Sequence, residues 1–164
     1  MQTINILKTL FLILMCLGCN NYPKKLPKDF SFVLINEVDS YDSETGHFIR
    51  KAINDRFQDT TVVCNLSTDD KEEIFKILKE NDVFTIPKNF ECASGAKYMM
   101  PQFTTILRYK IAGNKNEISY NTGCFPKKNI NEESRFENIT KFIQQKLYSK
   151  NAIKMLPKTK LRSM

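Results

Sequence analysis

Two residues of this chain have the spacing of a catalytic pair. Ser94 and Lys97 form a Ser-x-x-Lys sequence, in which a lysine one helical turn after a serine can accept its proton and activate the hydroxyl as a nucleophile. Gly95 follows the serine directly and weakens the helix that this geometry requires. The Ser-Asp-Asn and Lys-Thr-Gly sequences that accompany such a pair in enzymes are missing from the chain. We therefore assign no catalytic residue to this motif.

A short acidic segment could contact a cation through Asp39, Asp42, Ser43 and Glu44. An EF-hand calcium loop needs oxygen ligands at alternate positions and a glycine at the sixth, and the spacing here does not fit that pattern. His47 is the only histidine, and it has no cysteine or carboxylate at ligand spacing on its own element, so we interpret it as a strand-edge residue. The sequence predicts a solvated hairpin loop, with no metal, no cofactor and no catalytic site.

The first residues of the chain carry the clearest functional signal. A short cationic lead precedes an uncharged apolar run from Thr9 to Gly18, and Leu17-Gly18-Cys19 closes it. Because a bilayer-spanning helix needs about 20 apolar residues, this run is too short for one and is typical of a bacterial lipoprotein signal. We predict that residues 1–18 are a cleaved signal peptide and that the Cys19 thiol is lipidated. A secreted protein cut nearby and an uncleaved anchor are the alternatives.

Lipidation of Cys19 would determine where the protein resides. Two or more acyl chains, such as palmitate, hold a protein stably on a membrane, so we predict a lipid-anchored protein of the bacterial cell envelope. Residues 19–28 follow as a tether whose prolines disfavour regular structure and whose lysines would lie near anionic headgroups. No acidic residue falls between Cys19 and Lys28, which favours a periplasm-facing position.

Three cysteines remain after Cys19, namely Cys64, Cys92 and Cys124. An odd number in an oxidising compartment allows one internal bridge and leaves one thiol. Cys64 lies in an alternating apolar run, which predicts a buried thiol. Cys92 and Cys124 lie in loop-like segments where a disulfide between them could form. No Cys-x-x-Cys spacing and no histidine partner indicate zinc binding or redox catalysis.

The remaining sequence fits one globular domain over residues 29–150, which is a usual domain size. The 164 residues carry a formal net charge of +7, but 18 acidic residues are interspersed among the 25 basic ones, which is not the composition of a nucleic-acid-binding protein. The positive surplus gathers towards the C-terminus. We interpret residues 151–164 as a basic tail that is either solvated or in contact with an anionic membrane or an acidic partner.

The hydrophobic pattern of this domain predicts an α+β fold. Strand-like runs occur at 29–37, 47–53, 60–66, 104–111 and 116–121, with a polar loop at 38–46 and loop-like residues at 88–101. Ser67 can cap a helix that ends at a left-handed Asn81, and a second helix begins at Asn131. Within the second loop-like stretch, Tyr98–Phe103 could expose an apolar patch to a partner. We expect an antiparallel sheet of about five strands with two helices packed on one face.

Several of these motifs follow one another in a recognisable order: the strand and helix over 61–76, Asn81-Asp-Val-Phe-Thr-Ile-Pro87, the later hairpin, the helix that ends at Phe142–Leu147, and Ile153-Lys-Met-Leu-Pro157. This order resembles a group of uncharacterised lipoproteins best known from Bacteroidetes-type bacteria. The resemblance implies a shared fold and location. No catalytic residues are assigned in that group, so it implies none here.

Three classes of function are open at this point. A non-enzymatic binding or envelope-associated module is favoured by the signal, the single domain and the lack of polar clusters with catalytic spacing. An inhibitor or immunity-type protein could use its basic C-terminal end or Tyr98–Phe103 to cover a partner's site. An enzyme could assemble its site from scattered residues. We expect contacts with the membrane and with a protein partner, not with nucleic acid, and the sequence predicts no particular oligomeric state.

Overall fold

The computed structural model describes residues 22–52 and 58–156. The elements in chain order are β1 (Ser31–Ile35), β2 (Asp39–Asp42), β3 (His47–Arg50), β4 (Thr60–Val63), α2 (Thr68–Glu80), the 3-10 helix η2 (Val83–Thr85), β5 (Cys92–Tyr98), β6 (Thr104–Ile111), β7 (Asn114–Asn121), β8 (Cys124–Lys127), α3 (Ile130–Tyr148) and α4 (Asn151–Lys154). The predicted signal peptide, Cys19 and the last residues of the predicted tail lie outside the described residues.

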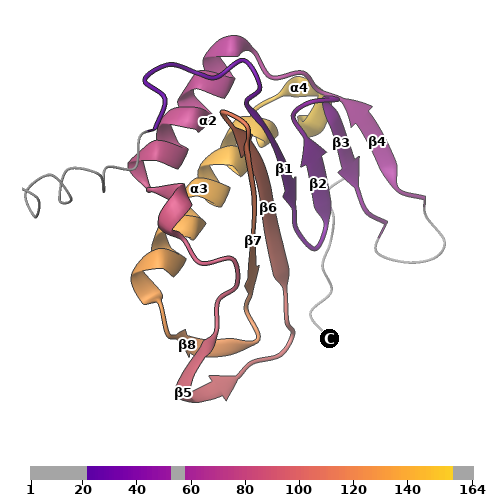
Figure 1. The fold of residues 1–164 in the computed structure, drawn as a ribbon. Helices are drawn as coiled ribbons and strands as arrows, with labels where there is room; N and C mark the ends of the chain where they lie inside the picture. The colour runs from indigo at the N-terminus through magenta and orange to yellow at the C-terminus, as the bar shows by residue number, and fades with distance from the viewer. Residues whose placement is uncertain (1–21, 53–57, 157–164) are drawn as a thin grey trace, which may run out of the picture.

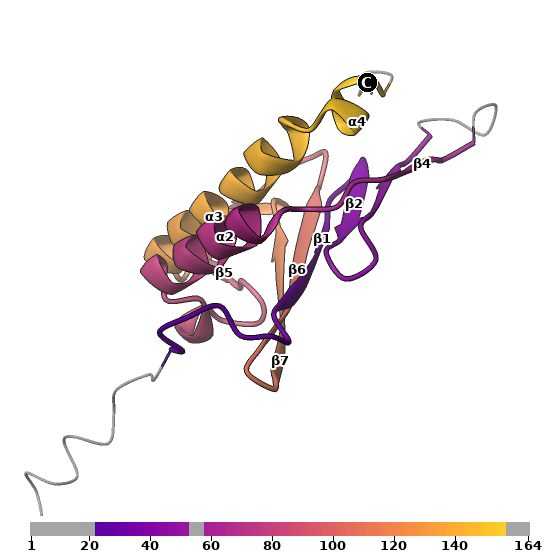
Figure 2. The same cartoon turned by 90° about the horizontal axis from the view of Figure 1, so that it is seen from above.

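The fold is α+β, as the hydrophobic pattern predicted. Six strands form an antiparallel sheet in the order β4-β3-β2-β1-β6-β7, and β5 and β8 form a separate two-stranded sheet. Figures 1 and 2 show α2 and α3 lying side by side on one face of the main sheet. The two-stranded sheet lies at the lower end of the molecule in Figure 1, at the start of α3.

The main sheet contains β2, in a segment that the sequence analysis interpreted as a polar loop. β2 pairs with both β1 and β3, so β2 is the strand that returns beside β1, and the His47–Arg50 strand is one place further out. This strand is difficult to predict from the sequence. Asp39 and Tyr41 are its two inward-facing residues, and a buried aspartate interrupts the apolar alternation that indicates a strand.

The prediction that residues 88–101 form a loop is wrong over Cys92–Tyr98, which belong to the two-stranded sheet. Residues Cys92–Tyr98 form β5, which pairs with β8 through Lys97 opposite Phe125 and Tyr98 opposite Cys124. The pairing register shifts between Cys92 and Lys97, and Gly95 adopts a left-handed φ of 76° there. Small residues and an irregular register leave no apolar period to detect.

The helix α2 follows its sequence signals closely at its start and less closely at its end. The Ser67 side chain accepts a hydrogen bond from the Asp70 backbone, and Asp70 accepts one from the Ser67 backbone, which completes a capping box. Asn81 has a φ of −95°, so it is not the left-handed stop that we expected. The next residue, Asp82, adopts the left-handed conformation with a φ of 45°.

The core lies between the helices and the covered face of the main sheet. Side chains from α2 and α3 that are almost fully buried pack against the inward-facing residues of β1, β2, β3, β6 and β7: Ile74, Leu78, Phe136, Ile139 and Ile143 from the helices, and Phe32, Leu34, Tyr41, Phe48, Leu107 and Ile118 from the strands. Cys64 is a free, buried thiol, as predicted. α4 adds Ile153 to this core.

Candidate functional site

The Ser-x-x-Lys spacing does not form a catalytic pair in this fold. Ser94 and Lys97 both lie on β5, and both are exposed. Residues three apart on a strand are separated by about 10 Å along the chain. The helical geometry that would bring the amine to the hydroxyl is therefore not present.

Oxygens of Asp39, Asp42 and Ser43 in the acidic segment are engaged by groups of the protein itself. Asp39 forms an ion pair with Arg50, and the Ser43 hydroxyl accepts a hydrogen bond from the Phe32 backbone at 2.7 Å. Asp42 accepts one from the Glu44 backbone at 2.8 Å. Over residues 22–52 and 58–156, no group of three or more histidine, cysteine or acidic residues is arranged to hold a metal ion.

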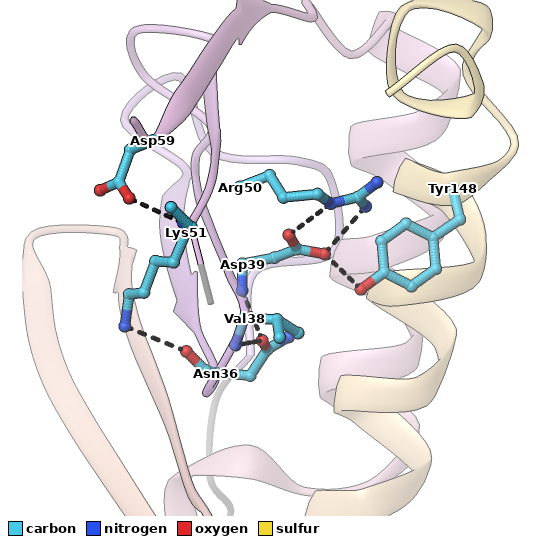
Figure 3. A network of polar contacts seen from close by, with 8 residues as sticks. Asn36, Val38, Asp39, Arg50, Lys51, Asp59 and Tyr148 are labelled. Atoms are coloured by element: carbon cyan, nitrogen blue, oxygen red, sulfur yellow. Dashed lines mark hydrogen bonds and ion pairs between the residues drawn. The ribbon is translucent and has the colours of Figure 1, made fainter. Parts of the chain in front are cut away.

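A buried polar network joins the main sheet to α3 (Figure 3). The Arg50 guanidinium donates to both carboxylate oxygens of Asp39 at 2.9 and 3.1 Å, and the Tyr148 hydroxyl donates to Oδ2 of the same carboxylate at 2.8 Å. Burial, and then the hydrogen bond to Asp39, raise the pKa of Tyr148 to about 12. Among the described residues, the cavity beside this network measures about 10 Å³. We therefore interpret the network as a structural link between β2, β3 and α3.

The uncovered face of the main sheet forms an open concavity of about 690 Å³. Its lining carries charges of both signs, three carboxylates and four cations. Arg108 pairs with Glu117 within it at 2.5 Å, and Lys110 pairs at 3.9 Å with Asp29, which lies outside the lining. Because these charges largely neutralise each other, this face offers no strong preference for an ionic ligand.

The two-stranded sheet carries the most unusual surface of the described residues. Four large apolar side chains are exposed on it or directly after β5: Tyr98 at 82% and Phe125 at 53% on its strands, and Met99 at 45% and Met100 at 81% after β5. We call these four residues the ribbon patch. Three of them belong to the segment Tyr98–Phe103 that the sequence singled out. Phe125 was missed, although its place directly after Cys124 brings it to β5 once the two cysteines are joined.

A disulfide closes the two-stranded sheet under the ribbon patch. Cys92 and Cys124 are joined with an S–S distance of 2.00 Å, and the Met99 backbone donates to the carbonyl of Gly123 at 2.9 Å. β5 and β8 are therefore fixed to each other covalently and by main-chain hydrogen bonds. The cross-link restricts how far the patch residues can separate.

Charged side chains also lie beneath this sheet, and no pattern in the sequence indicates their burial. Lys127 is only 4% exposed, and its Nζ donates to Cys124 Sγ at 3.2 Å and lies 5.4 Å from the centroid of the Tyr120 ring. The Tyr120 hydroxyl donates to Glu133 Oε1 at 2.5 Å, and burial followed by this bond raises the pKa of Tyr120. Glu133 Oε2 is buried and has no hydrogen-bond partner among the described residues.

Comparison with known proteins adds no assignment to these sites. No protein-family model matches the chain, and no curated protein matches it significantly. The resemblance to Bacteroidetes-type lipoproteins therefore stays a prediction. In the part of the chain that the structure describes, every helix is too short or too polar to cross a bilayer.

Proposed function

We propose that this chain is a lipoprotein of the bacterial cell envelope, anchored through lipidated Cys19, which acts by binding a protein partner through the ribbon patch and catalyses no reaction. The observation that carries the proposal is the exposure of Tyr98, Met99 and Met100 at the end of β5, together with Phe125 on the strand β8 that pairs with it. Contiguous exposed apolar side chains mark interaction sites on soluble domains. Aromatic residues and methionine are also enriched at protein interfaces.

The disulfide supports a binding role because it limits the motion of the patch. Each side chain or loop that is ordered only on binding reduces the affinity. Cys92–Cys124 and the Met99–Gly123 hydrogen bond already order the backbone that presents these side chains. An inhibitor or immunity-type protein is the special case in which the partner is an enzyme.

Tyr22 is packed against the domain, so its position limits how far the proposed lipid anchor could lie from the domain. Its ring stacks on Phe84 with centroids 4.7 Å apart, and its hydroxyl donates to Asp82 at 2.8 Å. Cys19 lies three residues earlier, so an extended chain could separate it from Tyr22 by at most about 10 Å. A lipid on Cys19 would therefore keep the end of α2 close to the membrane.

The anchor is tested by intact mass and membrane partition of the native protein and a Cys19→Ala variant. We expect the native protein to carry added lipid mass and to sediment with membranes, and the variant to lose both. A native protein without lipid mass that stays in the soluble fraction would contradict the anchoring.

The binding role is tested with a photo-crosslinking amino acid placed at Met100 in cells. Met155 is the matched control, because it is also an exposed methionine, at 86%, but lies beyond α4. We expect one discrete crosslinked species from position 100 and none from position 155. This species should disappear when Tyr98 and Phe125 are replaced by serine. Equal crosslinking from both positions, or none from position 100, would refute the proposed role of the patch.

A further inference from the structure

The two cysteines of the disulfide differ in burial. Cys124 is buried, with 2% exposure, whereas Cys92 is partly exposed. An attacking thiolate needs a path to the sulfur that it attacks. Access from solvent therefore favours Cys92 as the point of attack and leaves Cys124 as the sulfur that departs.

The buried ammonium group of Lys127 lies on the departing side. Its Nζ is 3.2 Å from Cys124 Sγ, and a neutral disulfide sulfur is a weak acceptor for an ammonium group. A thiolate at the same place would be a full counter-charge in a buried setting, where ion pairs are strong. Neighbouring lysines lower the pKa of cysteine thiols in this way.

Two other titratable groups face this site, and neither replaces the thiolate as a partner. Tyr120, from β7, presents its ring face to Lys127, and Glu133, from α3, accepts the Tyr120 hydroxyl through Oε1. Among the residues that the structure describes, no carboxylate forms an ion pair with Lys127. Reduction of the disulfide would give the buried ammonium its counter-charge.

We propose that Cys92–Cys124 is a directional thiol–disulfide exchange site, which a dithiol opens at Cys92 while Lys127 stabilises Cys124 as the leaving thiolate. A thiolate of the dithiol attacks Cys92 Sγ, a new S–S bond forms to that sulfur, and the electron pair of the broken bond passes to Cys124 Sγ. The second thiol of the dithiol then loses its proton to solvent and attacks the dithiol's first sulfur, which is bonded to Cys92 in the mixed disulfide. The bond between that sulfur and Cys92 Sγ breaks. Cys92 leaves as a thiolate and takes up a proton. The dithiol is oxidised by two electrons and the protein disulfide is reduced.

This inference does not depend on the binding role of the ribbon patch. It assigns positions to the chemistry: Cys92 receives the incoming sulfur, Cys124 departs, and Lys127 acts as a positioning and charge-stabilising residue.

The direction of opening is tested on the native, membrane-extracted protein in a Cys64→Ala background, which removes the remaining described thiol. The protein is treated briefly with reduced glutathione, quenched in acid, alkylated and digested for mass spectrometry. We expect glutathione on Cys92 and the alkyl group on Cys124. Glutathione on Cys124, an equal distribution over both cysteines, or a disulfide that remains closed in the native state would overturn the proposal.

The role of Lys127 is tested by measuring the equilibrium between disulfide and dithiol in glutathione buffers for three variants. Lys127→Met keeps the side-chain length without the charge, Lys127→Arg restores a cation, and Lys128→Met is the control, since Lys128 is exposed and pairs with Glu91. We expect Lys127→Met to lower the equilibrium constant for reduction about tenfold, which corresponds to about 30 mV. The arginine variant should recover most of this change, and the control should show none. An unchanged potential in a folded Lys127→Met protein would refute the assigned role.

Discussion

Replacing Arg50 by methionine should remove much of the stability that joins β3 to β2 and α3. The Arg50 side chain is 15% exposed and that of Asp39 is 5% exposed, and the guanidinium donates to both carboxylate oxygens. The variant keeps the length and apolar stem of the side chain but leaves a buried carboxylate without its cation. Among the described residues, Tyr148 would then supply the remaining side-chain hydrogen bond to the Asp39 carboxylate.

The magnitude follows from the burial of the carboxylate. Removing one partner of a buried ion pair costs about 3–5 kcal/mol, because the other charge stays in the interior. The Tyr148 hydroxyl still satisfies one oxygen, so we expect a loss near the lower limit, about 3 kcal/mol. For a domain of this size this loss lowers the melting temperature by roughly 10 °C. Arg50→Lys keeps the charge without the forked geometry, and it should lose less than Arg50→Met.

A double-mutant cycle separates this pair from other effects of the substitutions. The free energy of unfolding is measured by urea denaturation for Arg50→Met, Asp39→Leu and the double variant. We expect the double variant to be more stable than the sum of the single losses predicts, because it buries no unpaired charge at this position. A loss below about 1 kcal/mol for Arg50→Met, or single losses that simply add, would refute the reasoning.

Three further outcomes follow from other contacts. Replacing both Cys92 and Cys124 by alanine should lower the free energy of unfolding by about 4 kcal/mol in the chain-entropy account, since the bridge spans a separation of 32 residues; an unchanged urea midpoint would contradict this. Burial raises the pKa of Asp70, but hydrogen bonds from Lys150 and Ser67 outweigh this effect, and the net result is a lowered pKa. The ionised carboxylate therefore stabilises the fold at neutral pH. This stabilisation is lost as the pH falls below about 4. Asp70→Asn should flatten that acid limb, and an unchanged pH profile would count against the ion pair. Burial raises the pKa of Tyr109 and Tyr148 to about 12, so their contribution to stability is complete below about pH 10 and is lost between pH 10 and 12; ultraviolet titration showing both groups ionising near pH 10 in the folded protein would contradict this.

The parts of the fold that sequence reasoning predicted are those determined by neighbouring residues. The start of α2 depends on Ser67 and Asp70, which lie three residues apart and complete a capping box. The hairpin of β6 and β7 depends on alternation within each strand and on a turn with left-handed residues at Ala112 and Gly113. Both signals are local, so a reader of the sequence can recognise them without knowing the tertiary fold.

The parts that sequence reasoning missed depend on partners far along the chain. In the sequence Asp39 resembles a loop residue. The partners that make its burial favourable, Arg50 and Tyr148, lie 11 and 109 residues away and are not evident from the neighbouring residues. Lys127 reads as a surface residue for the same reason, although it is buried against Cys124 and Tyr120. A charged residue inside a strand becomes consistent with burial only when the tertiary fold supplies its partner.

The buried charges also differ in how completely the fold satisfies them. Asp39 has three side-chain hydrogen bonds, and Asp70 receives hydrogen bonds from Ser67 and Lys150. Beneath the two-stranded sheet, by contrast, Lys127 faces a disulfide sulfur and one oxygen of Glu133 lacks a partner among the described residues. Natural proteins depart from complete polar satisfaction mainly at functional sites. The exposure of the ribbon patch and the incomplete pairing near it are independent observations. Both support the proposal that function lies at the β5–β8 sheet rather than on the larger face of the main sheet, where charges of both signs are mixed.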